Sequence, residues 1–317
     1  MPTASSTVAD ALSRFRAGET VEAAPAPAAP ATPAAPVTTG KAKRVSFPRP
    51  NGEQYFARQI PGVAHDVELF RTSVGATLQD NLYILAYGNP GTGKTSGIEA
   101  AFPDLITVEG DGDTDTDQFM GQWALLPDGT YEWVDGPLIE AAEKGAALLI
   151  DEIALINPKV MSVVYSAMDG RGKFRVKNNP RRGIIEIKPG FTVIGACNPN
   201  APGARMSEAL LSRFNIHVEY TTDYDLMKSI GVPAKAVQVA KNLATQQASH
   251  TIRWKPEARE LLAFKKNVER YGIDFAAGNL IGVAPEADRP IVADAVSRAF
   301  GVAVAPLRSG DAAMTEL

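Results

Sequence analysis

Cysteine and histidine are scarce in this sequence of 317 residues. The single cysteine, Cys197, excludes an intramolecular disulfide and favours a reducing, cytoplasmic setting. The three histidines, His65, His217 and His250, are well separated in sequence and show no metal-ligand spacing. We therefore expect neither a disulfide-stabilised secreted domain nor a zinc centre.

Long apolar runs and a strong excess of one charge are also missing. No apolar run reaches about 18 residues, and prolines interrupt the N-terminal alanines, so we expect no membrane span and no secretory leader. The net charge is −4, with 45% hydrophobic and 21% charged residues. These are ordinary values for a globular protein and indicate no general affinity for nucleic acid or membranes.

Residues 1–44 have the composition of a tail. The first 20 or so could form one short amphipathic helix, because Thr7 and Asp10 make a capping-box pattern and Val8, Leu12 and Phe15 fall on one face. The stretch 19–40 is rich in Ala, Pro and Thr, which is typical of a semi-extended linker. We expect a disordered tail or, alternatively, a tethered docking peptide.

A glycine-rich loop between a predicted strand and a predicted helix is the strongest motif. Residues 82–87 are apolar strand formers, and residues 96–102 can form a helix that Pro103 ends. The loop between them fits G-x-x-x-x-G-K-[ST], in which glycines let backbone N–H groups approach phosphate oxygens at a helix N-terminus. The alternative is a glycine turn with a stray lysine. The candidate nucleotide-binding residues are Gly88, Asn89, Pro90, Gly91, Thr92, Gly93, Lys94, Thr95 and Ser96.

Two carboxylates follow a second apolar strand, residues 146–150. In this arrangement Lys94 would reach the β- and γ-phosphates, while Thr95 and Asp151 would hold Mg²⁺. Glu152 would polarise the attacking water as general base, which favours hydrolysis over phosphoryl transfer. Such a pair can alternatively cap a helix. No Asn-Lys-x-Asp follows, so ATP is favoured over GTP; a nucleotide kinase stays an alternative.

Two further polar residues are candidates for the same chemistry. Asn198 ends the predicted strand 191–196 and could position the attacking water, although an Asn-Pro pair also forms turns. Arg213 ends a short predicted helix, 207–214. An arginine supplied by a neighbouring subunit can stabilise charge on the transferring phosphoryl group; alternatively, Arg213 is an ordinary surface residue.

The order of predicted elements indicates the fold class. Short apolar strands alternate with helices over residues 45–220, which predicts an α/β parallel sheet covered on both faces. Two hairpins, near residues 122–134 and 173–188, are inserted in it. From about residue 221 the strands stop, and residues 233–246, 255–270 and 290–304 predict a smaller helical subdomain, 221–317.

Together these motifs resemble the AAA+ ATPases, specifically the MoxR-like (dynein-related) branch, from about Tyr55 to Phe264. Residues 88–95 match Walker A and 148–152 match Walker B. In the same resemblance Asn198 matches sensor 1, Arg213 the arginine finger, and the hairpins the helix-2 insert and the pre-sensor-1 hairpin. Arg259 falls where the sensor-2 arginine of the lid is expected, with Arg253 as an alternative.

The resemblance implies a homo-oligomeric, hexameric ring with ATP and Mg²⁺ between subunits, in which Arg213 completes the neighbouring site. It also implies remodelling of a macromolecular partner, which we expect to be a protein. The second hairpin concentrates basic residues that could hold an acidic polypeptide or a nucleic-acid backbone. A DNA- or RNA-associated motor is therefore one alternative, and an assembly scaffold with little turnover is another. The basic residues of the hairpin are Lys173, Arg175, Lys177, Arg181, Arg182 and Lys188.

Overall fold

The computed structural model describes residues 44–301 and 303–309. The predicted N-terminal helix and its Ala/Pro-rich linker lie outside the described residues. The described residues belong to one compact unit. None of the helices in the described ranges is both long enough and apolar enough to cross a bilayer.

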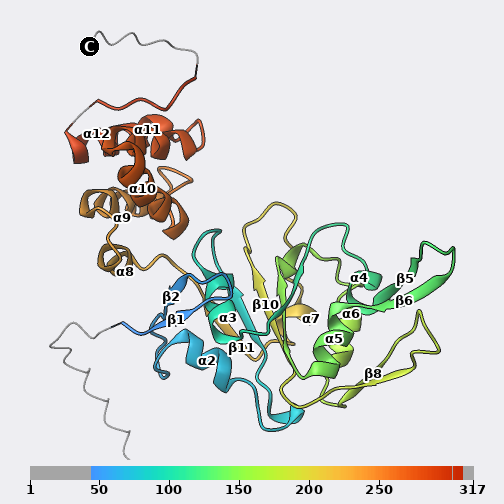
Figure 1. Cartoon of the computed structure of the whole chain (residues 1–317). Helices are drawn as coiled ribbons and strands as arrows, with labels where there is room; N and C mark the ends of the chain where they lie inside the picture. The colour runs from blue at the N-terminus through green and yellow to red at the C-terminus, as the bar shows by residue number, and fades with distance from the viewer. Residues whose placement is uncertain (1–43, 302, 310–317) are drawn as a thin grey trace, which may run out of the picture. The chain divides into compact units, whose positions relative to one another are not determined.

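Five parallel strands in the order β11-β3-β10-β7-β4 form the central sheet (Figure 1). The parallel register aligns their carboxyl ends: Cys197 lies opposite Tyr87 on one side, and Gly195 lies opposite Ile150 on the other. This confirms the predicted fold class, a parallel sheet flanked by helices with further helices at the C-terminus. The strands are β3 (Ile84–Tyr87), β4 (Ile106–Glu109), β7 (Ala147–Asp151), β10 (Thr192–Cys197) and β11 (Ile216–Glu219).

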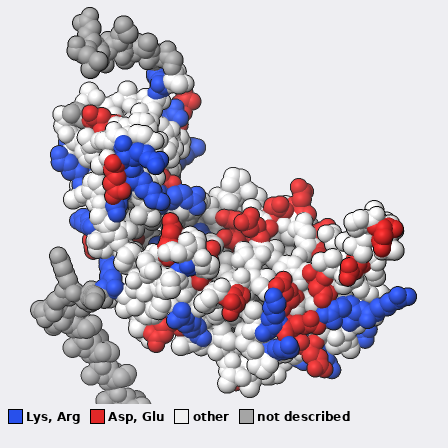
Figure 2. Space-filling view, viewed as in Figure 1, with Lys and Arg blue, Asp and Glu red and all other residues white. Residues whose placement is uncertain are grey.

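Three two-stranded antiparallel sheets lie outside the central sheet. Two are the predicted hairpins, and the third, β1–β2, was not predicted because its strands are short and one contains a proline. Figure 2 shows basic side chains gathered along the projecting hairpin at the right of the view, where Figure 1 places β8. The pairs are β1 (Ser46–Pro48) with β2 (Gln54–Phe56), β5 (Gly121–Leu125) with β6 (Tyr131–Asp135), and β8 (Lys173–Arg175) with β9 (Ile184–Glu186).

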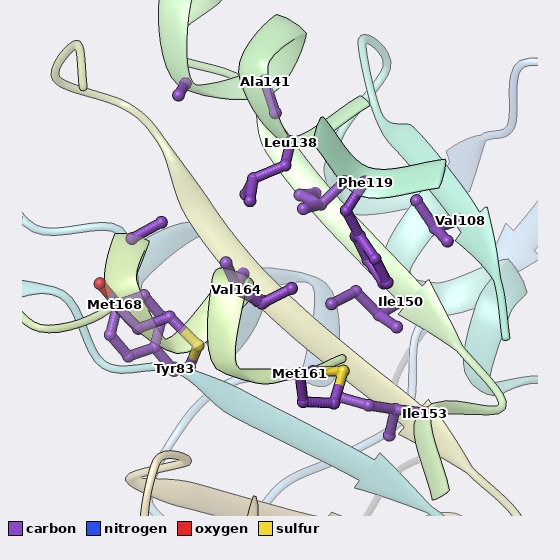
Figure 3. Close-up of a cluster of buried hydrophobic side chains, with 14 of the residues drawn as sticks. Tyr83, Val108, Phe119, Leu138, Ala141, Ile150, Ile153, Met161, Val164 and Met168 are labelled. Atoms are coloured by element: carbon purple, nitrogen blue, oxygen red, sulfur yellow. The ribbon is translucent and has the colours of Figure 1, made fainter. Parts of the chain in front are cut away.

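Hydrophobic residues cover both faces of the central sheet. In β7, Leu148 and Ile150 belong to one buried cluster and Leu149 to another, because successive side chains of a strand point to opposite faces. Figure 3 shows the first cluster, in which the Phe119 side chain lies next to Ile150 and Leu138 belongs to the same buried group. Helices α2 (Asp66–Thr72) and α3 (Lys94–Ala101) contribute to the second cluster, and α4 (Thr116–Met120), α5 (Pro137–Lys144), α6 (Ser162–Ala167) and α7 (Glu208–Leu211) to the first.

The C-terminal helices share a separate buried cluster, which runs from Leu226 to Val296. Its members project from amphipathic faces, as in α10, whose buried residues include Leu261 and Phe264. The strand-free region therefore has its own hydrophobic core. The helices are α8 (Tyr224–Ser229), α9 (Ala234–Ala248), α10 (Ala258–Tyr271), α11 (Ile273–Val283) and α12 (Arg289–Phe300).

Candidate nucleotide-binding site

The glycine-rich loop connects β3 to α3 and depends on glycine at specific positions. Gly88 has φ 144°, and a Cβ atom there would lie 2.3 Å from the Tyr220 carbonyl oxygen. Gly93 has φ 91° and is the N-cap of α3. Both backbone conformations are costly for other residues, and the close approach at Gly88 leaves no room for a side chain. The loop therefore brings backbone groups and the N-terminus of α3 to one place, which suits a phosphate.

Lys94, the first residue of α3, is 7% exposed and turns back onto the loop. Its ammonium donates to the carbonyl oxygens of Gly88 at 2.9 Å and Asn89 at 3.2 Å. Burial lowers the pKa of Lys94, while the charges of Glu152 and Asp151 act in the opposite direction. A cation that is buried yet bonded to exchangeable carbonyls can transfer its hydrogen bonds to phosphate oxygens.

Thr95 and Asp151 meet across the boundary between α3 and β7. The Thr95 hydroxyl donates to Asp151 Oδ2 at 2.8 Å, and the other carboxylate oxygen accepts from the backbone N–H of Glu152 at 2.9 Å. A hydroxyl and a carboxylate beside a phosphate loop are oxygen donors of the kind that Mg²⁺ takes in nucleotide sites. These two residues therefore fit the predicted metal site.

Glu152 has an unusual backbone, with φ 48° and ψ 35° in the left-handed region. Only one other non-glycine residue of the described chain, His250, has positive φ. Left-handed glutamate is costly, and such strain clusters at functional sites. The turn leaves one carboxylate oxygen of Glu152 3.3 Å from the backbone nitrogen of Asn198, which donates to it.

Asn198 directly follows β10, the strand that lies between β3 and β7. Its side chain is 8% exposed, and its amide oxygen accepts from the backbone N–H of Asn200 at 3.1 Å. Because the strands are parallel and in register, the loop, the Asp151–Glu152 pair and Asn198 all stand at one edge of the sheet. The structure thus brings together five of the predicted site residues, Lys94, Thr95, Asp151, Glu152 and Asn198.

The loop also contacts the first turn of α10. The backbone N–H of Arg259 donates to the Gly91 carbonyl at 3.1 Å, and the charge of Arg259 contributes to lowering the pKa of Lys94. Arg253, the alternative, has its backbone N–H bonded to Asp288 of the helical region instead. Arg259 is therefore the better placed of the two for contact with a nucleotide.

Glu257, which sequence reasoning missed, fastens this contact. Its carboxylate accepts from Asn89 at 2.7 Å, from Lys255 at 2.5 Å and from the Thr222 hydroxyl at 2.5 Å. Burial alone would raise the pKa of the Glu257 carboxyl, but these hydrogen bonds outweigh burial and lower the pKa below its ordinary value. The capping box that Glu257 forms with Glu260 was the one signal in the sequence that could have drawn attention to it.

A hydrogen-bond network around Arg58, which the sequence did not predict, also holds the loop. Arg58 donates to the Thr92 carbonyl and, at 2.8 Å, to the Thr221 carbonyl. Its backbone N–H donates to the fully buried Asp66, which also accepts from the Tyr220 hydroxyl at 3.0 Å. No sequence motif indicates this network, because its members come together only in the folded chain.

Arg213 stands apart from the other predicted residues. It is exposed, and its guanidinium lies 5.3 Å from the ring centroid of Tyr165 in α6. Its charge acts on the pKa of Tyr165 and of Asp169, and it is not among the groups that shift the pKa of Lys94. Within one chain the structure does not bring Arg213 to the loop.

The fold and this site define a P-loop nucleotide-binding domain, with the loop after one central strand and an acidic pair after another. The family model described as AAA domain (dynein-related subfamily) matches residues 84–214. The matched stretch begins with β3 and ends just after Arg213. Over residues 84–214 the chain therefore carries an AAA domain of the dynein-related subfamily.

Proteins with similar sequences match only part of the chain. Uncharacterized proteins of Staphylococcus aureus strains USA300 and NCTC 8325 are each 37% identical over 161 residues, which cover 47% of this chain and 60% of theirs. A crystal structure of a Cytophaga hutchinsonii protein proposed to be an ATPase is 15% identical, covers 74% of this chain and 85% of that one, and has a TM-score of 0.40. The chain therefore spans about 60% of the length of those staphylococcal relatives.

Proposed function

We propose that this protein is an Mg²⁺-dependent ATPase that works as a ring and remodels a macromolecular partner, which we take to be a protein. Its setting in the cytoplasm belongs to the same proposal and rests on the single cysteine. The observation that carries the catalytic part is the contact of Thr95 with Asp151 at 2.8 Å beside the buried Lys94.

Each residue of the site has a separate task in this proposal. Lys94 binds the terminal phosphates, and Thr95 and Asp151 hold Mg²⁺, which neutralises phosphate charge. Glu152 accepts the proton of the attacking water, and its strained turn and its bond from the Asn198 N–H orient its carboxylate. Asn198 positions that water, and Arg259 contacts the nucleotide from the helical side.

The position of Arg213 supports the proposed ring. An arginine that is exposed and contacts Tyr165, rather than the loop of its own chain, is available to a neighbouring molecule. Arginines supplied in this way stabilise charge in the transition state of phosphoryl transfer. Six subunits are the number that the family resemblance implies, and each site is complete only at a subunit boundary.

The test is the ATPase rate per subunit as a function of protein concentration, with the oligomer mass measured in parallel with and without ATP and Mg²⁺. We expect the specific rate to rise as the ring assembles and to disappear when EDTA removes the metal. A rate independent of concentration in a stable monomer would refute the shared site. An assembled ring without turnover, even with candidate partners added, would favour the scaffold.

A further inference from the structure

The β8 strand of the second hairpin carries a row of cations. Phe174 and Val176 are buried, whereas Lys173 and Arg175 are exposed on the opposite face of the strand. Residues two apart on a strand are separated by roughly 6.8 Å along it. Arg171 and Lys177 continue this alternation on either side of the strand.

These cations line one groove. It has a volume of about 530 Å³ and lies beside β8, α4 and α6. Its walls contain the four basic residues together with hydroxyl groups and apolar side chains. The apolar part includes Met120, Val163 and Ile184, so the groove can bind aliphatic groups as well as anions.

Most of this positive charge has no partner in the described part of the chain. Arg171 pairs with Asp169, but Lys173, Arg175 and Lys177 have no side-chain hydrogen bond or ion pair with any described residue. Arg182, further along the same hairpin, differs: it pairs with Asp135 and Glu143. The partners of Arg182 raise its pKa, chiefly through the hydrogen bond to Asp135.

The backbone of β8 also has an open edge. Ile187 N–H donates to the Gly172 carbonyl at 2.8 Å, and Val176 N–H donates to the Gly183 carbonyl at 2.9 Å. In an antiparallel pair the residues between such bonds point their N–H and C=O groups away from the partner strand. Lys173 and Arg175 are those residues, and no third strand from residues 44–301 or 303–309 joins this sheet.

We propose that the groove beside β8 binds an extended acidic segment of a protein partner, whose alternate carboxylates contact Lys173, Arg175 and Lys177. A peptide that pairs with the open edge repeats its side chains at the spacing of the cations. The open strand edge favours peptide over nucleic acid, since only a polypeptide backbone can continue the hydrogen-bond ladder of β8. The inference rests on the proposed function in one point, namely that the bound partner is the protein that the ATPase remodels.

The test uses the full chain and three fluorescent probes: a short peptide with glutamate at every second position, a peptide of the same composition with its glutamates in one block, and single-stranded oligothymidylate. Binding is followed by fluorescence anisotropy at low and high salt. The test variant is Lys173→Glu/Arg175→Glu. The matched control is Arg181→Glu, which reverses an exposed charge of the same hairpin outside the groove.

We expect the alternating peptide to bind best, and the double variant to bind it at least about tenfold more weakly while the control changes little, because reversed charges repel a ligand. Equal binding of both peptides would overturn the strand pairing. Preference for the oligonucleotide would replace the acidic peptide by nucleic acid. If neither peptide binds, the proposal is wrong, and the cations only protect the exposed strand edge against pairing with other chains. If the wild type lacks ATPase activity but the binding pattern holds, the proposed function fails and the groove stands.

Discussion

The nucleotide site and the groove beside β8 treat positive charge in opposite ways. Lys94 is 7% exposed, bonded to two carbonyls of its own loop and close to Glu152 and Asp151. Lys173 and Arg175 are exposed and lack such partners in the described residues. Salt screens exposed charges much more than buried ones, so chemistry at the site is insulated from the medium while binding at the groove depends on it. The difference separates a cation whose partners lie in its own chain from cations whose partners would have to come from a second molecule.

Arg213 is an exception to this comparison, because it is exposed and yet is proposed to take part in ATP hydrolysis. Replacing Arg213 by Ala should lower the turnover of the assembled protein by roughly 10³-fold or more, while ATP still binds. Mixing this variant with Lys94→Ala protein should restore part of the activity, because mixed rings contain sites with an intact loop next to an intact arginine. Steady-state turnover across mixing ratios is the measurement, and a strictly additive result would contradict the shared site.

Glu152 tests the nucleotide site alone, because it belongs to the same chain as the loop. Glu152→Gln should reduce turnover by roughly 10²–10⁴-fold, because an amide cannot accept the proton of the attacking water. ATP affinity should persist, since the amide oxygen can still accept from the Asn198 N–H. Single-turnover hydrolysis and nucleotide binding, measured side by side, separate the two effects. Glu132→Gln, in the exposed β6 strand, is the control for loss of a carboxylate and should retain normal turnover.

Substitution of Glu257 should give the smallest effect, and it tests the contact between the loop and the helical region. Glu257→Gln should lower the free energy of unfolding at pH 7 by about 1.5–3 kcal/mol, the range for hydrogen bonds to a charged group. Because the hydrogen bonds lower the folded-state pKa, this stability is fully present above the ordinary pKa of a glutamate side chain and is lost as the pH falls through the lower folded-state pKa. Denaturant unfolding at pH 7 and below pH 4.5 should show the difference shrinking. Glu269→Gln, exposed on the same helix, should show no such pattern.

Sequence patterns gave the central sheet and its site because both depend on local signals. The loop motif, the apolar strand before Asp151 and the Asn-Pro after β10 are each readable within a few residues, and parallel order then brings them together. The two hairpins were predicted for the same reason. The Thr95–Asp151 contact follows once those strands are placed next to one another.

Elements without a local signal were missed. Helix α11 is apolar on most sides and contains Gly278 and Gly282, so it shows neither an amphipathic period nor a good helix propensity. The reason for Gly278 is tertiary: a Cβ atom there would lie 2.9 Å from the Ala305 carbonyl oxygen. The Arg58–Asp66 network likewise joins separate segments, which a single sequence cannot place side by side.

The hydrogen bonds between the loop and α10 couple the movement of these two elements. The Gly91 carbonyl accepts from the Arg259 N–H, and the Asn89 amide donates to Glu257. A ligand that displaces the loop must therefore shift the start of α10 or break these bonds. By thermodynamic reciprocity, a molecule that binds the helical region and changes the nucleotide affinity of the loop by some factor has its own affinity changed by the nucleotide by the same factor. A molecule bound to the helical region would thus be able to set the nucleotide affinity without touching the loop.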